Sequence, residues 1–202
     1  MSSLFRFCLC LAALCCGLNP AFADQADAAK IAMMNDKPLP ASDPRSTLSA
    51  LFAELKSANI SALPQSKDLL LLQNYLSKDL LRLFQEALQA ETVCIAAAAA
   101  DEKPTMIEGD LFSGNVEGFS ELAYGKVSIA ANHANVALSF MNTDTRFPHA
   151  HHFRNFAWPA QAMLVKDKNS GAWLVDDIRF FAPRGLRRDL HDYLQAAKRY
   201  CN

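Results

Sequence analysis

The hydrophobic period of this chain changes from helical to alternating, and this change constrains the fold more than any other sequence feature. Over residues 43–104 apolar side chains recur at spacings of three and four, the repeat of one buried helix face. Over residues 122–181 they alternate with polar ones, as in strands buried on one side. Helical spacing returns at Gly185. This order predicts an α+β fold with three helices, a four-stranded antiparallel sheet and a C-terminal helix.

Three helices are expected before the sheet. Asp43 is a suitable N-cap and Pro44 suits a first helical position. A short second helix is predicted over residues 69–75. The third helix begins at Ser77, and the alanine run that follows it favours helix until Pro104 ends it.

Four strands are expected as two hairpins, over residues 122–130, 134–142, 157–165 and 173–181. The first hairpin turns at Asn132-His133, because Asn tolerates a positive φ. The second turns at residues 167–171, where Asp167 and Gly171 give a hairpin signal. We see no internal repeat, and one domain over residues 43–202 is expected.

The N-terminus has the pattern of a cleavable secretory signal peptide. Arg6 precedes an apolar run of about ten residues, and Ala21 and Ala23 are the small residues that a signal peptidase reads. Cleavage between Ala23 and Asp24 leaves a leader at residues 24–42. We therefore expect a periplasmic or secreted protein.

Two alternatives for the N-terminus involve the membrane. The apolar run is about half of the ~20 residues needed to span a bilayer, so no stable membrane span is predicted. Cys15 and Cys16 lie where a lipid-carrying cysteine would be found. The residue before Cys15 is Leu14, where a small residue is expected, so lipid anchoring is the minor alternative.

Removal of the signal peptide leaves two of the six cysteines, Cys94 and Cys201. Two thiols in an oxidising compartment favour one disulfide. Closing a loop of that length would stabilise the fold by up to about 4.7 kcal/mol in the chain-entropy model. The alternative is two unpaired cysteines, one in a helix and one near the C-terminus.

Charge gives little support for nucleic-acid binding. The exported chain keeps nineteen of the twenty Lys and Arg residues and all twenty-one acidic ones, for a net charge near −2. The densest basic cluster is Arg184, Arg187 and Arg188, which we interpret as the solvated face of the last helix. Motifs of serine hydrolases, nucleotide-binding loops and zinc ribbons are missing, and no cofactor is expected.

The segment over residues 169–178, with its turn glycine, Trp173 and alternating strand, resembles the nuclear transport factor 2-like superfamily. Within it the chain is similar to the exported bacterial domain-of-unknown-function family 3828. The Asp43-Pro44 start, residues 74–77 and 109–112 and the Trp173 strand carry this similarity, which covers residues 43–194.

The resemblance implies a cone, in which helices pack on a strongly curved sheet and enclose a pocket. In relatives the pocket holds a small apolar ligand, forms an isomerase or dehydratase site, or is filled by side chains. Dimers joined through the sheet are common. Because the fold does not decide the function, a small ligand, an envelope protein and a second copy of the chain all remain as expected partners.

Asp176 is the most unusual residue of the last strand. Strict alternation places it on a face with apolar neighbours, where desolvation would raise its pKa as a general base requires. Tyr124 and Trp158 are candidate donors across the pocket. The alternative is that Asp176 is partly exposed or hydrogen-bonded to a helix end. Asp177 and Arg179 share the other face as an ion pair.

Two further groups are candidate ligands. His149, His151 and His152 have the residue type of a metal site, completed by His133 or Asp144. Their polar, proline-containing surroundings favour instead a solvated loop, or one that responds to pH.

Asp110 lies in a Gly- and Asp-rich run over residues 109–118. This run predicts a tight crossing rather than a calcium loop, because it has few oxygen ligands.

The sequence thus predicts an exported, non-catalytic domain that binds a small ligand or a protein partner. The alternative is a small isomerase or dehydratase in which Asp176 and Tyr124 are catalytic. The expected ligand-binding residues are Asp110, Tyr124, Trp158, Trp173 and Asp176.

Overall fold

A computed structural model describes residues 43–99, 101, 103–104, 106–143, 155–181 and 183–201. The segments predicted as a signal peptide (residues 1–23) and a leader (residues 24–42), together with Asp144 and the histidines at 149, 151 and 152, lie outside these residues. The described elements are α2 (Pro44–Ser57), α3 (Ser66–Leu72), α4 (Lys78–Ala97), β1 (Glu121–Ala130), β2 (His133–Thr143), β3 (Asn155–Lys166), β4 (Trp173–Arg179) and α5 (Leu186–Tyr200). An α+β fold with four helices and a four-stranded antiparallel sheet is therefore confirmed for this part of the chain.

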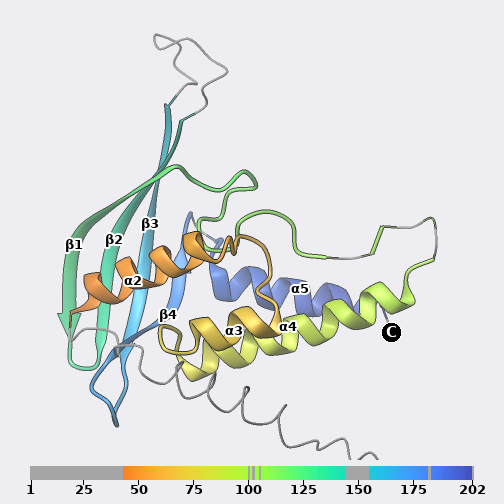
Figure 1. The fold of residues 1–202 in the computed structure, drawn as a ribbon, viewed down its shortest axis with the longest axis horizontal. Coiled ribbons are helices and arrows are strands. Elements are labelled where there is room, and N and C mark those ends of the chain that lie inside the picture. The colour runs from red at the N-terminus through yellow and green to blue at the C-terminus, as the bar shows by residue number, and fades with distance from the viewer. Residues whose placement is uncertain are drawn as a thin grey trace, which may run out of the picture. The chain divides into compact units, whose positions relative to one another are not determined.

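The strands form an open sheet in the order β1-β2-β3-β4, with every neighbouring pair antiparallel (Figure 1). The alternating pattern buries one face of β2 and β3. Val136 and Phe140 of β2 and Ala162 of β3 have no exposed surface. Small and polar side chains on the opposite face remain accessible, including Ala137 and Ser139. One face of the sheet thus forms the core with the helices.

Helix α2 lies across the buried face and contacts β1, β2 and β4, whereas α4 and α5 lie side by side and contact β4 (Figure 1). The short helix α3 packs on α2 and α4. Amphipathic spacing explains α2, whose buried residues include Leu48, Leu51 and Leu55. These packing partners set the position of α2 over the edge strand β1.

The helix starts predicted at Asp43 and Ser77 are confirmed, whereas the second helix spans Ser66–Leu72 rather than the predicted residues 69–75. The Asp43 carboxylate accepts a hydrogen bond from the Ser46 backbone N–H, and Ser77 Oγ accepts one from Leu80. The expectation that α4 continues to Pro104 is wrong, because the helix ends at Ala97. Between Cys94 and residue 99 no further side chain is buried, so alanine propensity alone does not extend the helix.

The two hairpin turns differ in how well the sequence predicted them. In the β3–β4 turn Asp167 Oδ1 accepts hydrogen bonds from the backbone of Asn169 and Ser170, and Gly171 has φ +72°. In the β1–β2 turn the positive φ of 51° belongs to Ala131 rather than to Asn132. The pairing of Ala130 with His133 leaves a two-residue loop. The geometry of this loop gives the positive φ to its first residue, Ala131.

Strand β4 contains a bulge that the alternating pattern did not predict. Met163 pairs with Asp177 and Leu164 pairs with Val175, so Asp176 is an extra residue. Val175 and Ile178 are consequently both fully buried. Strict alternation would place Val175 and Ile178 on opposite faces, but the bulge reverses the alternation after Asp176.

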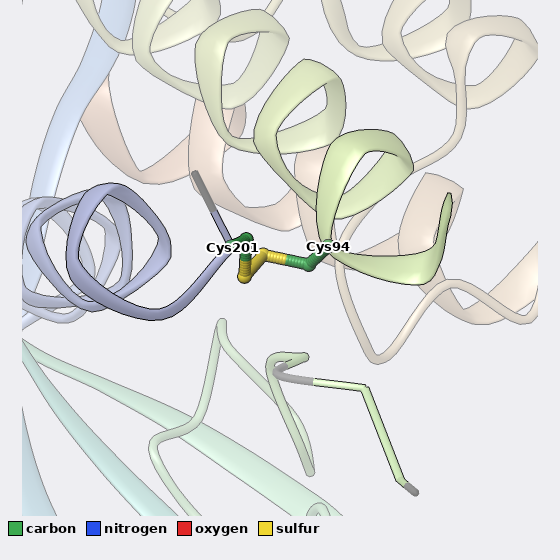
Figure 2. Close-up of a disulfide and its surroundings, with 2 residues drawn as sticks. All are labelled: Cys94 and Cys201. Atoms are coloured by element: carbon green, nitrogen blue, oxygen red, sulfur yellow. A yellow bond between two sulfur atoms is a disulfide. The ribbon is translucent and has the colours of Figure 1, made fainter. Parts of the chain in front are cut away.

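The predicted disulfide is present. Cys94, near the end of α4, is bonded to Cys201, directly after α5, with Cα atoms 4.8 Å apart (Figure 2). The bond fastens together the C-terminal ends of two helices that pack along their length. Among the described helices, none is both long and apolar enough to cross a membrane.

Candidate functional site

A cleft of about 450 Å³ opens between α2, β1 and the loop over residues 107–120. We call it the α2–β1 cleft. Helix α2 and its C-terminal extension contribute Ser49, Phe52, Ala53, Leu55, Lys56, Asn59, Ile60 and Ser61, and the loop and β1 contribute Asp110, Phe112, Glu117, Gly118, Phe119, Ser120, Leu122 and Tyr124. Its volume lies in the range of small-molecule sites.

Aromatic rings form part of the apolar lining of the cleft. The rings of Phe52 and Phe119 meet edge to face with centroids 5.7 Å apart, and Phe119 contacts Phe140 at 4.9 Å. Phe52 also contacts Phe140 at 5.7 Å. Such edge-to-face contacts fix the orientation of each ring. The apolar surface of the cleft is therefore anchored in the core.

Tyr124 is the main polar group on the β1 side. It lies on the core-facing side of β1, and burial raises the pKa of its hydroxyl while a hydrogen bond with Ser49 of α2 opposes the shift. The tyrosine is therefore a neutral hydroxyl at pH 7. A second contact between the elements is the hydrogen bond from Arg45 to the Gly125 carbonyl. Both contacts hold α2 over β1.

Asp110 organises the loop that forms the rim. Its Oδ1 accepts backbone hydrogen bonds from Phe112 at 2.8 Å and Ser113 at 3.3 Å, and its Oδ2 accepts one from Ser113 Oγ at 2.8 Å. Burial raises the pKa of this carboxyl, and the three hydrogen bonds oppose that shift. The predicted tight crossing is confirmed, because Asp110 also pairs with Asn115 through the backbone.

Several hydrogen bonds tie the loop to the body of the domain. The Leu111 backbone N–H donates to the Ser61 carbonyl at 3.0 Å, after α2. The Trp158 indole N–H donates to the Ser113 carbonyl at 2.9 Å, from β3. Asp110 and the backbone around it thus form a cleft wall whose polar groups have partners within the protein.

The structure brings together only two of the five residues expected to bind a ligand. Asp110 and Tyr124 both line the α2–β1 cleft. Trp158 and Trp173 are 2 % and 3 % exposed and belong to the core. Trp173 lies beneath the Lys166 ammonium, which is 5.7 Å from its ring centroid.

Asp176 does not line this cleft, and the apolar environment expected for it is not found. Its Oδ1 accepts a hydrogen bond from Ser77 Oγ at 2.6 Å and pairs with the Arg187 guanidinium, whose Nε donates to the Asp176 carbonyl at 2.6 Å. The bulge turns the carboxylate toward the starts of α4 and α5. The expected ion pair between Arg179 and Asp177 is present, with Nε and Oδ2 3.3 Å apart.

The metal hypothesis falls on residues that the structure does not describe, apart from His133, which begins β2 and is exposed. Within the described ranges, no group of three His, Cys, Asp or Glu side chains is placed to hold a metal ion.

Sequence reasoning missed the α2 side of the cleft. In the hydrophobic pattern of α2, Ser49 and Lys56 occupy polar positions that are typical of the solvated face of an amphipathic helix. The pattern therefore does not mark them as cleft residues. Asn59 carried a usable signal, since an Asn directly after a helix favours the left-handed conformation, and its φ is +54°.

The sequence matches no protein-family model, and comparisons with curated proteins and with solved structures found no significant match. The function is therefore argued from the cleft itself.

Proposed function

We propose that this protein is an exported, non-catalytic domain that binds a small, mainly apolar ligand in the α2–β1 cleft. The observation that carries the proposal is the cleft of about 450 Å³, which joins the Phe52–Phe119 surface to the Tyr124 hydroxyl. In this proposal the cleft is the mouth of the cone that the resemblance to the nuclear transport factor 2-like superfamily implies.

Export is supported by the N-terminal sequence and by the disulfide. Structural disulfides persist in oxidising compartments outside the cytoplasm, and Cys94 and Cys201 are the two cysteines that would remain after cleavage at Ala23. Mass spectrometry of the protein from its native host tests this part. A mature N-terminus at Asp24 is expected, whereas an intact Met1 would overturn it.

The polar groups of the cleft indicate a ligand with few polar atoms. Tyr124 and Ser49 already form a hydrogen bond, and the oxygens of Asp110 accept bonds from its own loop. A ligand therefore gains most of its affinity from apolar contact with the aromatic rings. At the open edge Lys56 and Glu117 are exposed and remain available to a polar end of the ligand.

The isomerase or dehydratase hypothesis stays as an alternative, with Asp176 as base. Its carboxylate is bound by Ser77 and Arg187, so proton abstraction would have to compete with a charge-assisted hydrogen bond. Turnover of an enolisable ketone by the purified protein, abolished in Asp176→Asn, would favour this alternative over binding alone.

A variant that fills the cleft tests the binding proposal. Ala53 lines the cleft and is exposed, so Ala53→Phe places a ring in the open volume without burying it in the core. We expect the affinity for the fluorescent apolar probe 8-anilinonaphthalene-1-sulfonate to fall at least about tenfold, a loss of ~1.4 kcal/mol.

The matched control is Ala96→Phe, which adds the same ring to an exposed alanine of α4 outside the cleft. Its probe affinity should equal that of the unmodified protein. Equal affinities for all three proteins would show that the probe binds elsewhere and would overturn the assignment of the cleft.

A further inference from the structure

A second cleft, of about 500 Å³, lies where β4 meets the start of α5. We call it the β4–α5 cleft. Its lining includes the four arginines Arg179, Arg184, Arg187 and Arg188, together with Asp177 and Phe181. A tight turn brings them together, because Arg179 forms a bridge with Gly185 and the Arg184 backbone N–H donates to the Phe181 carbonyl. This cleft shares no lining residue with the α2–β1 cleft.

One of the four arginines is committed to the fold. Arg187 pairs with Asp176 through its guanidinium, and its backbone N–H donates to Asp177 Oδ1 at 3.0 Å. The other three make one-nitrogen ion pairs with carboxylates, at 3.3 Å for Arg179, 2.7 Å for Arg184 and 3.0 Å for Arg188. A guanidinium carries five N–H donors in a planar fork, so these contacts use a small part of its capacity.

Arginines outnumber acids in the lining, although each arginine is paired with an aspartate. Asp177 is the one acidic side chain of the lining, and both of its oxygens accept hydrogen bonds, from Arg187 and Arg179. The acids that pair with Arg184 and Arg188, Asp189 and Asp192, are not among the lining residues. The side chains of Arg179, Arg184 and Arg188 are between 53 and 61 % exposed. The partners Asp177 and Asp189 are 11 and 18 % exposed, whereas both members of the Arg188–Asp192 pair are exposed. This last pair is therefore the weakest and exchanges most readily for a better anion.

Phosphate is an anion that guanidinium groups recognise well. Guanidinium groups bind phosphate oxygens through two parallel N–H donors, which is stronger and more specific than a one-nitrogen contact. Phe181, which also lines the cleft, is 49 % exposed. An exposed aromatic side chain beside basic residues is typical of protein surfaces that lie at a lipid headgroup region.

We propose that the β4–α5 cleft binds a phosphate group, and that an anionic lipid headgroup carries it. Arg184 and Arg188 supply the guanidinium donors, Arg179 adds a third positive charge, and Phe181 contacts the apolar edge of the lipid surface. This inference does not depend on a ligand in the α2–β1 cleft.

Two probes test the proposal on the purified protein. The first is flotation with vesicles of phosphatidylcholine mixed with phosphatidylglycerol, against vesicles of phosphatidylcholine alone. The second is titration with inorganic phosphate, followed by NMR of the arginine Nε–H signals. In Arg184→Gln/Arg188→Gln we expect vesicle binding to weaken at least about tenfold, because the variant loses the charge-assisted hydrogen bonds of two guanidinium groups. Arg187 stays unchanged because it holds Asp176.

The control Arg82→Gln/Lys103→Gln lowers the net charge equally. Both residues form exposed ion pairs, with Glu86 and Glu108, outside the cleft. Loss of binding in the cleft variant with retention in the control supports the proposal.

Phosphate-induced shifts without vesicle binding would replace the lipid with a soluble phosphate and overturn the lipid assignment. Equal losses in both variants, or no response to either probe, would overturn the site.

Discussion

At the scale of single residues, Asp110 is both buried and hydrogen-bonded. Burial raises the pKa of its carboxyl, whereas the hydrogen bonds lower it. Desolvation is the larger effect, so the pKa of the folded carboxyl lies above its usual value of 3.8. A carboxyl of this kind contributes stability below pH 3.8, and that contribution is lost as the pH rises through the folded pKa. We therefore expect the free energy of unfolding of the native protein, relative to that of Asp110→Asn, to fall as the pH rises above 3.8.

Urea denaturation at several pH values measures this difference, and Asp167→Asn is a control of opposite sign. Hydrogen bonds from Ser170 hold the pKa of the Asp167 carboxyl below its usual value, so its contribution is present at neutral pH and is lost on acidification. A flat difference for Asp110, or one that rises with pH, would contradict the assignment.

At the scale of elements, Asp176 joins three of them. It belongs to β4, accepts a hydrogen bond from Ser77 at the start of α4, and pairs with Arg187 in the first turn of α5. Asp176→Asn removes the charge but keeps the shape. We expect it to lower the free energy of unfolding by about 1–3 kcal/mol, because the Arg187 guanidinium loses its charged partner. Chemical denaturation checks this value.

Asp192→Asn is the matched control for that variant. It removes the partner of Arg188 in an ion pair on the exposed side of α5, where such pairs contribute about 0.3–0.5 kcal/mol. Equal destabilisation by the two substitutions would show that the Asp176–Arg187 contact between β4 and α5 contributes no more to stability than an exposed ion pair.

The same strand shows what the sequence can predict and what it cannot. Hydrophobic spacing and capping residues such as Asp43 and Ser77 located the helices and strands, because these signals are local. The bulge at Asp176 depends on how β4 pairs with Met163 and Leu164, which a single strand does not encode. Strict alternation therefore assigned Asp176 to the wrong environment.

The residues of the candidate site were likewise predictable only where the signal is local in the sequence. Asp110 was identifiable from its glycine-rich loop. Ser49 joins the cleft because α2 packs against β1. This contact depends on tertiary packing, and no local sequence pattern predicts it.

At the scale of the whole domain, the disulfide closes a long covalent loop. Cys94 and Cys201 are 107 residues apart in sequence, and the loop between them contains the entire sheet. Cross-linking such a loop stabilises mainly by reducing the conformational entropy of the unfolded chain. We expect Cys94→Ser/Cys201→Ser to lower the free energy of unfolding by about 2–5 kcal/mol, measured by urea denaturation without reductant.

Reduction separates the effect of the covalent bond from that of the substitutions. The native protein in reductant should unfold at a urea concentration equal to or slightly above that of the double variant, and the variant should not respond to reductant. Because Cys94 is buried between α4 and α5, a serine there adds a buried hydroxyl cost that reduction does not. A variant much less stable than the reduced native protein would therefore assign the loss to helix packing rather than to chain entropy. A native protein whose stability is unchanged after full reduction would contradict the prediction.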